Sequence, residues 1–148
     1  MNQSILIASD HRGLNLKAQL TAWMTAHGYQ PRDIGTHSAE RCDASDFASQ
    51  LAGDIRDGKA NRGVLICGTG QAMAMTANRY RDVRAALCAD VTTARLTRQH
   101  NDANVLVLGA DIIGAGVAED CLEAFLTTEF LGDRYAERLE KLKALGGL

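Results

Sequence analysis

The chain has 148 residues, enough for one domain of ordinary size with a buried core. Hydrophobic residues make up 46% of it and charged residues 23%, a balance typical of a globular protein and unlike that of a disordered one. The formal net charge of −2 gives no electrostatic reason to expect nucleic acid as a partner, and no apolar run approaches the ~18 residues of a membrane span, so we expect neither partner.

The four cysteines, Cys42, Cys67, Cys88 and Cys121, form no C-x-x-C pair, which argues against a zinc site and against a redox motif. Cys88 and Cys121 stand among apolar residues and are expected to be buried and inert. Reduced thiols fit a cytoplasmic location. Residues 1–4 carry neither a basic leader nor a small-residue cleavage site, so no signal peptide is expected.

The first half of the chain alternates short apolar runs with segments of helical period. Residues 5–8 predict a buried strand, and Leu16, Leu20 and Met24 then recur at the spacing of one helix face until Gly28. A weaker strand is predicted over residues 29–34. The helix after it carries Phe47, Leu51 and Ile55 on one face and ends near Gly58.

The second half repeats the pattern. Strands are predicted at residues 63–67, 84–88 and 104–108, the first leading through Gly68-Thr69-Gly70 into a helix. A short helix precedes the last of these strands, and two helices follow it, at about 114–130 and 133–145. Five strands separated by helical crossovers predict an α/β fold: a three-layer α/β/α Rossmann-like sandwich with a five-stranded parallel sheet. No linker or repeat is present, so residues 1–148 are expected to form a single domain.

Two segments lie directly after predicted strands and carry reactive side chains. Asp10 and His11 follow the first strand, and Cys67 closes the third. Ligands of open parallel sheets bind outside the carboxyl ends of the strands, and the first and third strands of a doubly wound sheet are normally neighbours. We therefore expect these two segments to face one another across a crevice.

Cys67 stands just before a helix, where backbone N–H groups favour a thiolate. Gly68 and Gly70 would let the backbone approach a ligand closely, and amides there could stabilise a negative oxygen. The alternative is a core cysteine beside an ordinary glycine turn. The glycine pair lacks the third glycine of a dinucleotide fingerprint and is followed by no Walker lysine.

Two further groups are expected at the opposite, amino edge of the sheet. His100 and Asn101 precede the fifth strand, about 16 Å from the crevice if that strand has five residues. Arg134 and Arg138, four residues apart, place two guanidinium groups on one helix face, an arrangement that suits a phosphate dianion. If these groups act with Cys67, a second subunit must supply them, and the expected assembly is a homodimer or tetramer with shared active sites.

Ordinary roles remain open for both groups. His100 could be a capping or surface histidine. The two arginines could belong to a solvated helix face with Glu137 and Glu140 as their local partners.

The set of motifs resembles the ribose-5-phosphate isomerase B family, which also includes galactose-6-phosphate isomerase. The matching pieces run in order from residue 4 to about residue 140, and several short motifs in register are far more specific than any one of them. They are Ser9-Asp10-His11-x-Gly13, Asp33-x-Gly35-Thr36, Ile66-Cys67-Gly68-Thr69-Gly70, Ala77-Asn78, Arg84-Ala85, Thr97-Arg98-Gln99-His100-Asn101-Asp102, Gly109-Ala110 and Gly132-x-Arg134-x-x-x-Arg138.

The resemblance implies aldose–ketose isomerisation of a sugar phosphate through a cis-enediolate, most simply ribose 5-phosphate to ribulose 5-phosphate. It implies that Cys67 moves the carbon-bound proton and that Thr69 moves protons between the two oxygens. Asp10 and His100 would assist ring opening, and the amides after Gly68, including that of Gly70, would form an anion hole. No metal or organic cofactor is implied.

The resemblance also implies the binding groups for the substrate. Asn101 would hold the enediolate oxygens. His11, Arg134 and Arg138 would bind the phosphate. The C-terminal helix, at about 133–145, would pack on a partner subunit.

The chain departs from the family pattern at Ala44, Ala72, Ala74 and Asp111. The family commonly has Tyr-Pro where this chain has Ala44-Ser45, and an arginine implicated in phosphate binding where it has Asp111. An anion near a phosphate is costly unless the ligand differs. We therefore keep a different four- to six-carbon sugar phosphate as an alternative substrate, and two further classes beside it: a non-catalytic sugar-phosphate-binding paralogue and a nucleotide-binding module.

Overall fold

The computed structural model describes residues 4–148; residues 1–3, on which part of the signal-peptide prediction depends, lie outside this range. Its centre is one five-stranded sheet in which every neighbouring pair is parallel. The strand order is β2-β1-β3-β5-β4, so the predicted pairing of the first and third strands is confirmed. The strands are β1 (Ile5–Ser9), β2 (Pro31–Asp33), β3 (Arg62–Cys67), β4 (Ala85–Leu87) and β5 (Val105–Gly109).

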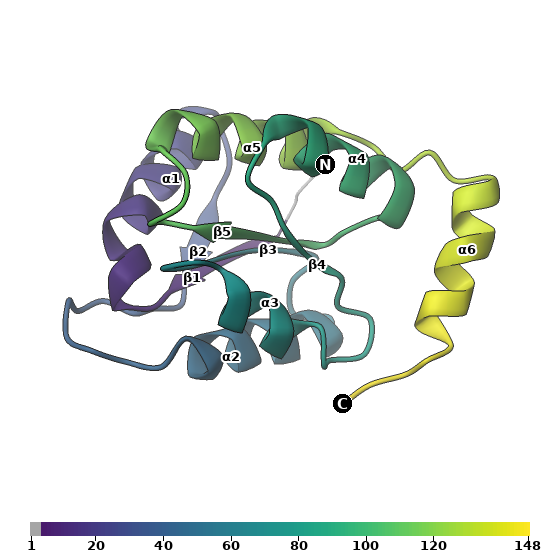
Figure 1. Ribbon diagram of the computed structural model, residues 1–148, viewed down its shortest axis with the longest axis horizontal. Coiled ribbons are helices and arrows are strands. Elements are labelled where there is room, and N and C mark those ends of the chain that lie inside the picture. Colours follow the sequence, from purple (N-terminus) through teal and green to yellow (C-terminus); the bar gives the residue numbers. More distant parts are fainter. Residues whose placement is uncertain (1–3) are drawn as a thin grey trace.

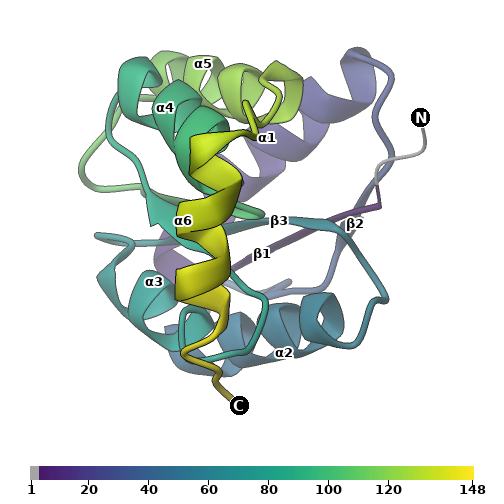
Figure 2. The same ribbon diagram turned by 90° about the vertical axis from the view of Figure 1, so that its right-hand side faces the viewer.

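Helices cover both faces of the sheet and confirm the three-layer architecture. Figure 1 shows α1, α4 and α5 on one face and α2 and α3 on the other, while α6 stands at the side of the molecule. Figure 2 shows α6 running from the α4 layer toward the α3 layer. The helical elements are the 3₁₀ turn η1 (His11–Gly13) and the helices α1 (Leu14–Ala26), α2 (Ala44–Arg56), α3 (Gln71–Ala77), α4 (Val91–Asn101), α5 (Ala115–Thr127) and α6 (Arg134–Lys143).

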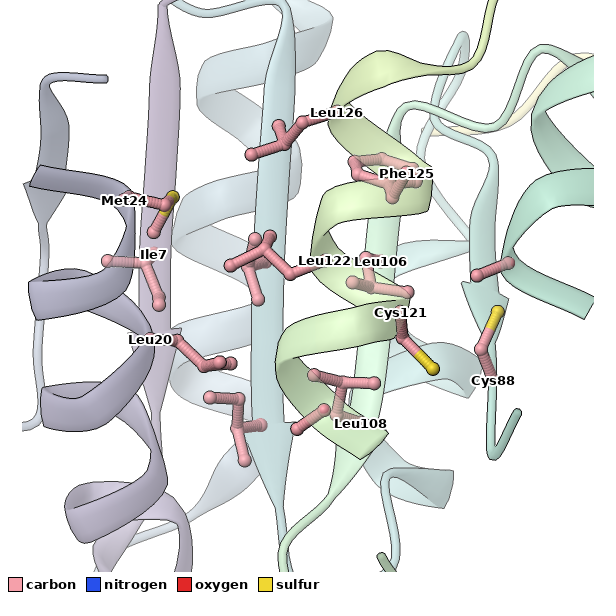
Figure 3. Close-up of a cluster of buried hydrophobic side chains, with 14 of the residues drawn as sticks. Ile7, Leu20, Met24, Cys88, Leu106, Leu108, Cys121, Leu122, Phe125 and Leu126 are labelled. Atoms are coloured by element: carbon pink, nitrogen blue, oxygen red, sulfur yellow. The ribbon is translucent and has the colours of Figure 1, made fainter. Parts of the chain in front are cut away.

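The alternation of side chains along the strands builds two cores. Successive residues of a strand point to opposite faces, so Ile7, Val64 and Leu106 meet α1 and α5, whereas Leu6, Leu65 and Val107 meet α2 and α3. Figure 3 shows how Leu122 and Phe125 of α5 and Leu20 and Met24 of α1 close the first core. Full burial of one such side chain contributes roughly 1.5–3 kcal/mol.

Some element boundaries differ from the predicted ones. β2 has three residues instead of six because it is the edge strand beside β1, and it begins at Pro31, whose missing N–H is tolerated there. Helix α5 ends at Thr127, three residues earlier than predicted. Within residues 4–148, no helix combines the length and hydropathy that a bilayer crossing requires.

Candidate active site

The loop after β1 holds Asp10 in a fixed, largely buried position, with 6% of its surface exposed. Its backbone N–H donates to the carbonyl of Ile66, 3.2 Å away, which joins this loop to the end of β3. Its carboxylate Oδ1 accepts the N–H groups of Arg12 and Gly13, at 3.0 and 3.2 Å. The carboxylate thereby caps η1 and is oriented by the backbone.

Cys67 is the last residue of β3 and is 5% exposed. The backbone N–H of Gly70 donates to its Sγ at 3.1 Å. Gly70 has φ +82°, in the left-handed region that glycine adopts without strain, and this turn brings its amide back over the sulfur. The second glycine of Gly68-Thr69-Gly70 is therefore required by the structure, because its amide positions the Cys67 thiol.

Thr69, in the loop of residues 68–70 after Cys67, and His11, in the neighbouring loop after β1, have defined hydrogen-bonding states. The Thr69 Oγ1 accepts the N–H of Gln71 at 3.3 Å, which leaves its hydroxyl hydrogen for another partner. The His11 Nδ1 accepts the N–H of Cys42 at 3.3 Å. A neutral His11 consequently carries its proton on Nε2, where it can be donated.

The structure thus brings six of the ten predicted site residues to the carboxyl ends of two neighbouring strands. β1 and β3 are paired in register up to Ser9 and Ile66, so the loops that follow them are adjacent. The six residues are Asp10, His11, Cys67, Gly68, Thr69 and Gly70.

An ion pair that sequence reasoning did not identify lies against the loop of residues 68–70. The Arg12 Nε and Nη2 donate to Asp111 Oδ2 at 2.7 and 2.5 Å. The pair crosses directly over Gly68, because a Cβ built there would lie 2.9 Å from both Arg12 Nε and Asp111 Oδ2. Asp111 therefore has a cationic partner beside the loop that follows β3. No local signal links two residues 99 positions apart.

The other four predicted residues gather elsewhere. His100 and Asn101 end α4, while Arg134 and Arg138 project from α6. His100, Asn101 and Arg138 line one cavity of about 370 Å³. Neither arginine forms an ion pair with a carboxylate of residues 4–148, so the predicted alternative of Glu137 and Glu140 as their local partners is not what the structure has.

Within one chain, the six residues at the carboxyl ends of β1 and β3 lie apart from the other four. In the register of β3 and β5, Cys67 pairs with Gly109 at the carboxyl end, whereas Gly63 pairs with Val105 at the amino end. His100 and Asn101 precede Val105, so about 13 Å of strand separates them from the level of Cys67. The structure thus confirms the predicted placement at opposite edges of the sheet, with a separation shorter than the predicted value of about 16 Å.

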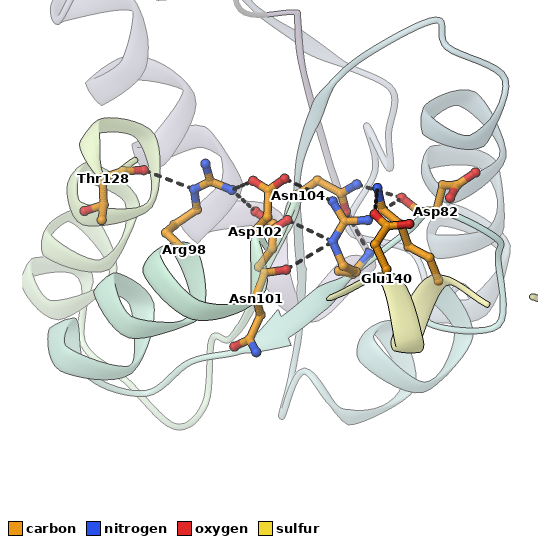
Figure 4. Close-up of polar contacts among 10 residues, drawn as sticks. Asp82, Arg98, Asn101, Asp102, Asn104, Thr128 and Glu140 are labelled. Atoms are coloured by element: carbon orange, nitrogen blue, oxygen red, sulfur yellow. Dashed lines mark hydrogen bonds and ion pairs between the residues drawn. The ribbon is translucent and has the colours of Figure 1, made fainter. Parts of the chain in front are cut away.

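A buried polar network anchors the segment that carries His100 and Asn101 (Figure 4). Arg98, 3% exposed, donates to Asp102 Oδ1 at 2.8 Å and to the carbonyl of Ala103 at 2.7 Å. Arg84 donates to the carbonyls of Asn101 and Asp102. Burial lowers the pKa of Arg84, and the neighbouring Asp102 charge opposes that shift. Asp102, part of the recognised motif, acts here as an anchor.

Sequence reasoning also missed Tyr135, which stacks on His100 with ring centroids 4.4 Å apart. Its hydroxyl accepts a hydrogen bond from Arg134 Nη2 at 3.0 Å, and this bond raises the pKa of Arg134. The signal that could have revealed it is an aromatic residue between two arginines of one helix. In the described part of the chain, no three His, Cys, Asp or Glu side chains are grouped to hold a metal ion.

Comparison with known proteins identifies relatives over nearly the whole chain. A model described as ribose/galactose isomerase matches residues 5–142. Ribose-5-phosphate isomerase B of Escherichia coli is 36% identical, covering 97% of this chain and 96% of its own. D-erythrulose-4-phosphate isomerase of Pectobacterium atrosepticum is 37% identical, covering 94% of this chain and 92% of its own.

Solved structures agree with these relatives. Ribose-5-phosphate isomerase B of Clostridium thermocellum superposes with a TM-score of 0.94 at 39% identity, covering 97% of both chains. The enzyme of Mycoplasma genitalium with bound ribulose 5-phosphate gives 0.94 at 34% identity, covering 98% of this chain and 97% of its own. Because the Escherichia coli and Pectobacterium enzymes are almost equally similar to this chain, identity alone does not separate their substrates.

Proposed function

The chain belongs to the ribose/galactose isomerase family and is a sugar phosphate isomerase; from that premise we propose that it interconverts ribose 5-phosphate and ribulose 5-phosphate. The observation that carries this proposal is the Cys67 sulfur, held by the Gly70 amide beside the loop of Asp10 and His11. A relative that binds ribulose 5-phosphate supports the choice of sugar.

The proposed chemistry moves one carbon-bound proton and one oxygen-bound proton. The Cys67 thiolate removes the proton from C2, which leaves a cis-enediolate, and the resulting thiol returns that proton to C1. Thr69, whose hydroxyl hydrogen is free, passes the second proton between the two oxygens. Amides of the loop after Gly68 stabilise the negative oxygen that exists only during the reaction. No atom is gained or lost.

The remaining predicted residues bind and prepare the sugar. Asp10 and His100 assist opening of the ring, and Asn101 holds the enediolate oxygens. His11 donates its Nε2 proton to the phosphate, a role supported by the hydrogen bond that occupies its Nδ1. Arg134 and Arg138 supply two guanidinium groups to the same phosphate.

Within one chain, His100, Asn101, Arg134 and Arg138 lie far from Cys67. The proposal therefore includes a homodimer or tetramer in which a second subunit supplies these four residues. Helix α6 supports this arrangement: Leu139 is buried, but Leu142 and Leu145 are 49% and 81% exposed. Packing on a partner would cover them. A cytoplasmic location belongs to the same proposal, since all four cysteines are free.

Mixing an inactive variant with a strongly impaired one tests the shared site. Cys67→Ser should be inactive and His100→Ala should keep a low, measurable kcat; they damage different halves of the site, so a hybrid dimer regains one intact site from its two wild-type halves. Unfolding and refolding an equal mixture should restore about a quarter of the wild-type activity. A mixture as inactive as its components would show that each chain carries its own complete site.

Loss of proton exchange tests the base. Cys67→Ser should abolish turnover of ribose 5-phosphate and the exchange of its C2 proton in D₂O, with an unchanged circular dichroism spectrum. The control Cys42→Ser replaces the partly exposed thiol beside His11 and should retain exchange. Normal exchange by Cys67→Ser would refute the role of Cys67.

A different sugar phosphate of four to six carbons is the second candidate, favoured by the Arg12–Asp111 pair over Gly68 and by the small Ala44. Rates on four-, five- and six-carbon sugar phosphates decide between them, since the true substrate has the highest kcat/KM. Thermal stabilisation by several sugar phosphates without turnover of any would instead favour a non-catalytic binding protein.

A further inference from the structure

Tyr135, in the first turn of α6, contacts three of the predicted site residues. Its ring lies nearly parallel to the His100 imidazole, at an interplanar angle of 12° with the centroids 4.4 Å apart. The guanidinium carbons of Arg134 and Arg138 lie 5.0 and 5.8 Å from the centroid of the same ring. One aromatic side chain therefore touches the imidazole and both guanidinium groups.

For His100 the stack sets the plane of the ring and leaves its nitrogens free. No hydrogen bond joins either His100 ring nitrogen to another group within residues 4–148. A hydrogen bond would occupy one nitrogen and select a tautomer, whereas stacking restricts rotation without using a donor or an acceptor. This is what a histidine needs if it exchanges protons with a substrate.

For the arginines the ring reduces the cost of placing two like charges four residues apart. Such a pair is unfavourable on a helix by itself. The electron-rich face of the ring attracts both guanidinium groups, and the hydroxyl accepts a hydrogen bond from Arg134 Nη2. Because no carboxylate within the described range pairs with either arginine, most of their N–H groups remain free for an anion.

The attachment of α6 to the rest of the chain makes this contact important. Leu139 is the buried residue of α6, and just before the helix the N–H of Leu131 donates to the carbonyl of Gln99 at 3.1 Å. The stack of Tyr135 on His100 adds a second link between this segment and the end of α4. It therefore sets where the arginines lie relative to His100.

We propose that Tyr135 is a positioning residue that holds His100, Arg134 and Arg138 in a fixed arrangement relative to one another. These three residues are the part of the active site that one subunit contributes to its neighbour. The proposal rests on the function proposed above. Tyr135 touches no reacting atom and acts through the imidazole and the guanidinium groups.

Two substitutions separate its two actions. Tyr135→Phe keeps the stack but loses the hydroxyl, so KM for ribose 5-phosphate and the inhibition constant of inorganic phosphate should both rise about three- to tenfold, with kcat within about twofold of wild type. Tyr135→Leu removes the ring, so kcat should also fall about tenfold or more. The control Tyr29→Leu removes a tyrosine stacked on Trp23 and should leave kcat and KM unchanged.

A double-mutant cycle identifies the route of the effect. If Tyr135 acts on kcat through His100, Tyr135→Leu should lower kcat in the wild type but not further in His100→Ala. An equal loss in both backgrounds, or a folded Tyr135→Leu enzyme with wild-type kcat and KM, would overturn the proposal. If Tyr135→Leu does not fold, Tyr135→Gln carries the same test in this half-exposed turn.

Failure of this proposal is distinct from failure of the proposed function. A wild-type protein with no activity on any sugar phosphate refutes the function. Active wild-type protein together with unaffected Tyr135 variants refutes only the positioning role. If the protein is inactive, phosphate binding can still be measured by calorimetry. Unchanged binding by Tyr135→Phe and Tyr135→Leu would then refute the claim that Tyr135 positions the two arginines.

Discussion

Gly70 has two reasons to be glycine. Its φ of +82° lies in the left-handed region, and a Cβ on it would lie 2.5 Å from the Leu87 Cδ1. The same turn aims its N–H at the Cys67 sulfur. Backbone conformation, packing and the position of the thiol are therefore coupled at one residue.

We expect Gly70→Ala to lower kcat about tenfold or more and the free energy of unfolding by about 1–3 kcal/mol, because the turn must shift and carry the amide away from the sulfur. Gly58→Ala is the matched control: Gly58 has φ +76° with open space around its Cβ position. It should lose stability but keep its kcat. Kinetics and urea unfolding of both variants measure this. Wild-type kcat in Gly70→Ala would contradict the coupling.

Arg12 and Asp111 add two opposite charges at the rim of the proposed site. Since both are well exposed, at 60% and 44%, their contribution to folding is about 0–1 kcal/mol. Their effect on an anionic ligand is a more sensitive readout, because the field of a single charge extends about 10 Å at 0.1 M salt.

We predict that Arg12→Met weakens inhibition by inorganic phosphate and that Asp111→Asn strengthens it, each about two- to fivefold at low ionic strength. The double variant should return close to the wild-type value, and the differences should shrink in 1 M salt. Inhibition constants at two salt concentrations measure this. Equal values for all four proteins would place the phosphate away from the pair.

At the scale of elements, the junction between α4 and β5 shows how a half-exposed loop is held. Asp102, with φ +46°, accepts a bond from buried Arg98 and lies beside Arg84. The network joins the end of α4 to the carbonyls of Ala103 and of Thr128 at the end of α5. This junction holds the segment of His100 and Asn101, and Tyr135 stacks on His100.

Asp102→Ala should lower the free energy of unfolding by about 1–3 kcal/mol, because Arg98 loses its anionic partner, and should raise KM as the loop shifts. The control Asp90→Ala acts at the other end of α4, where the Asp90 carboxylate caps the helix through the N–H of Thr93. It should lose some stability without a change in KM. If Asp102→Ala had wild-type KM and stability, the anchoring role would be wrong.

At the scale of the whole molecule, the core contains two thiols that meet the solvent only on unfolding. Cys88 and Cys121 are 1% and 0% exposed, which confirms their predicted burial. Burial, reinforced by the Coulombic interaction with Cys121, raises the pKa of Cys88 to about 12, and burial raises that of Cys121 to about 11. Both thiols are therefore protonated in the folded protein at neutral pH.

Stability should consequently fall at alkaline pH. Below pH 9 both states keep these protons; above it the unfolded chain releases them while the folded chain holds them up to about pH 11–12, so unfolding becomes easier. The slope is at most about 1.4 kcal/mol per pH unit for each thiol. Cys88→Ala should flatten urea-unfolding free energies between pH 9 and 11, whereas Cys42→Ala should not. Parallel curves for Cys88→Ala and wild type would contradict this.

Periodic patterns explain why so much of the fold was predictable. These patterns depend only on neighbours within one element. They are hydrophobic runs of strand length, helical spacing such as that of Leu16, Leu20 and Met24, and glycines at the ends of elements. The handedness of crossovers then allows few arrangements of parallel strands. Boundaries at β2 and α5 were less accurate, because edge position and packing decide them.

For this protein the sequence alone determined the five-strand parallel architecture, the family, and the ten residues proposed for the site, because local periodicity and ordered motifs carry that information. Only the tertiary structure decided that Arg12 neutralises Asp111 over Gly68, that Asp102 anchors the α4–β5 junction, and that Tyr135 gathers His100 with two arginines. Contacts between residues far apart in the chain depend on how elements pack, and no local pattern encodes them.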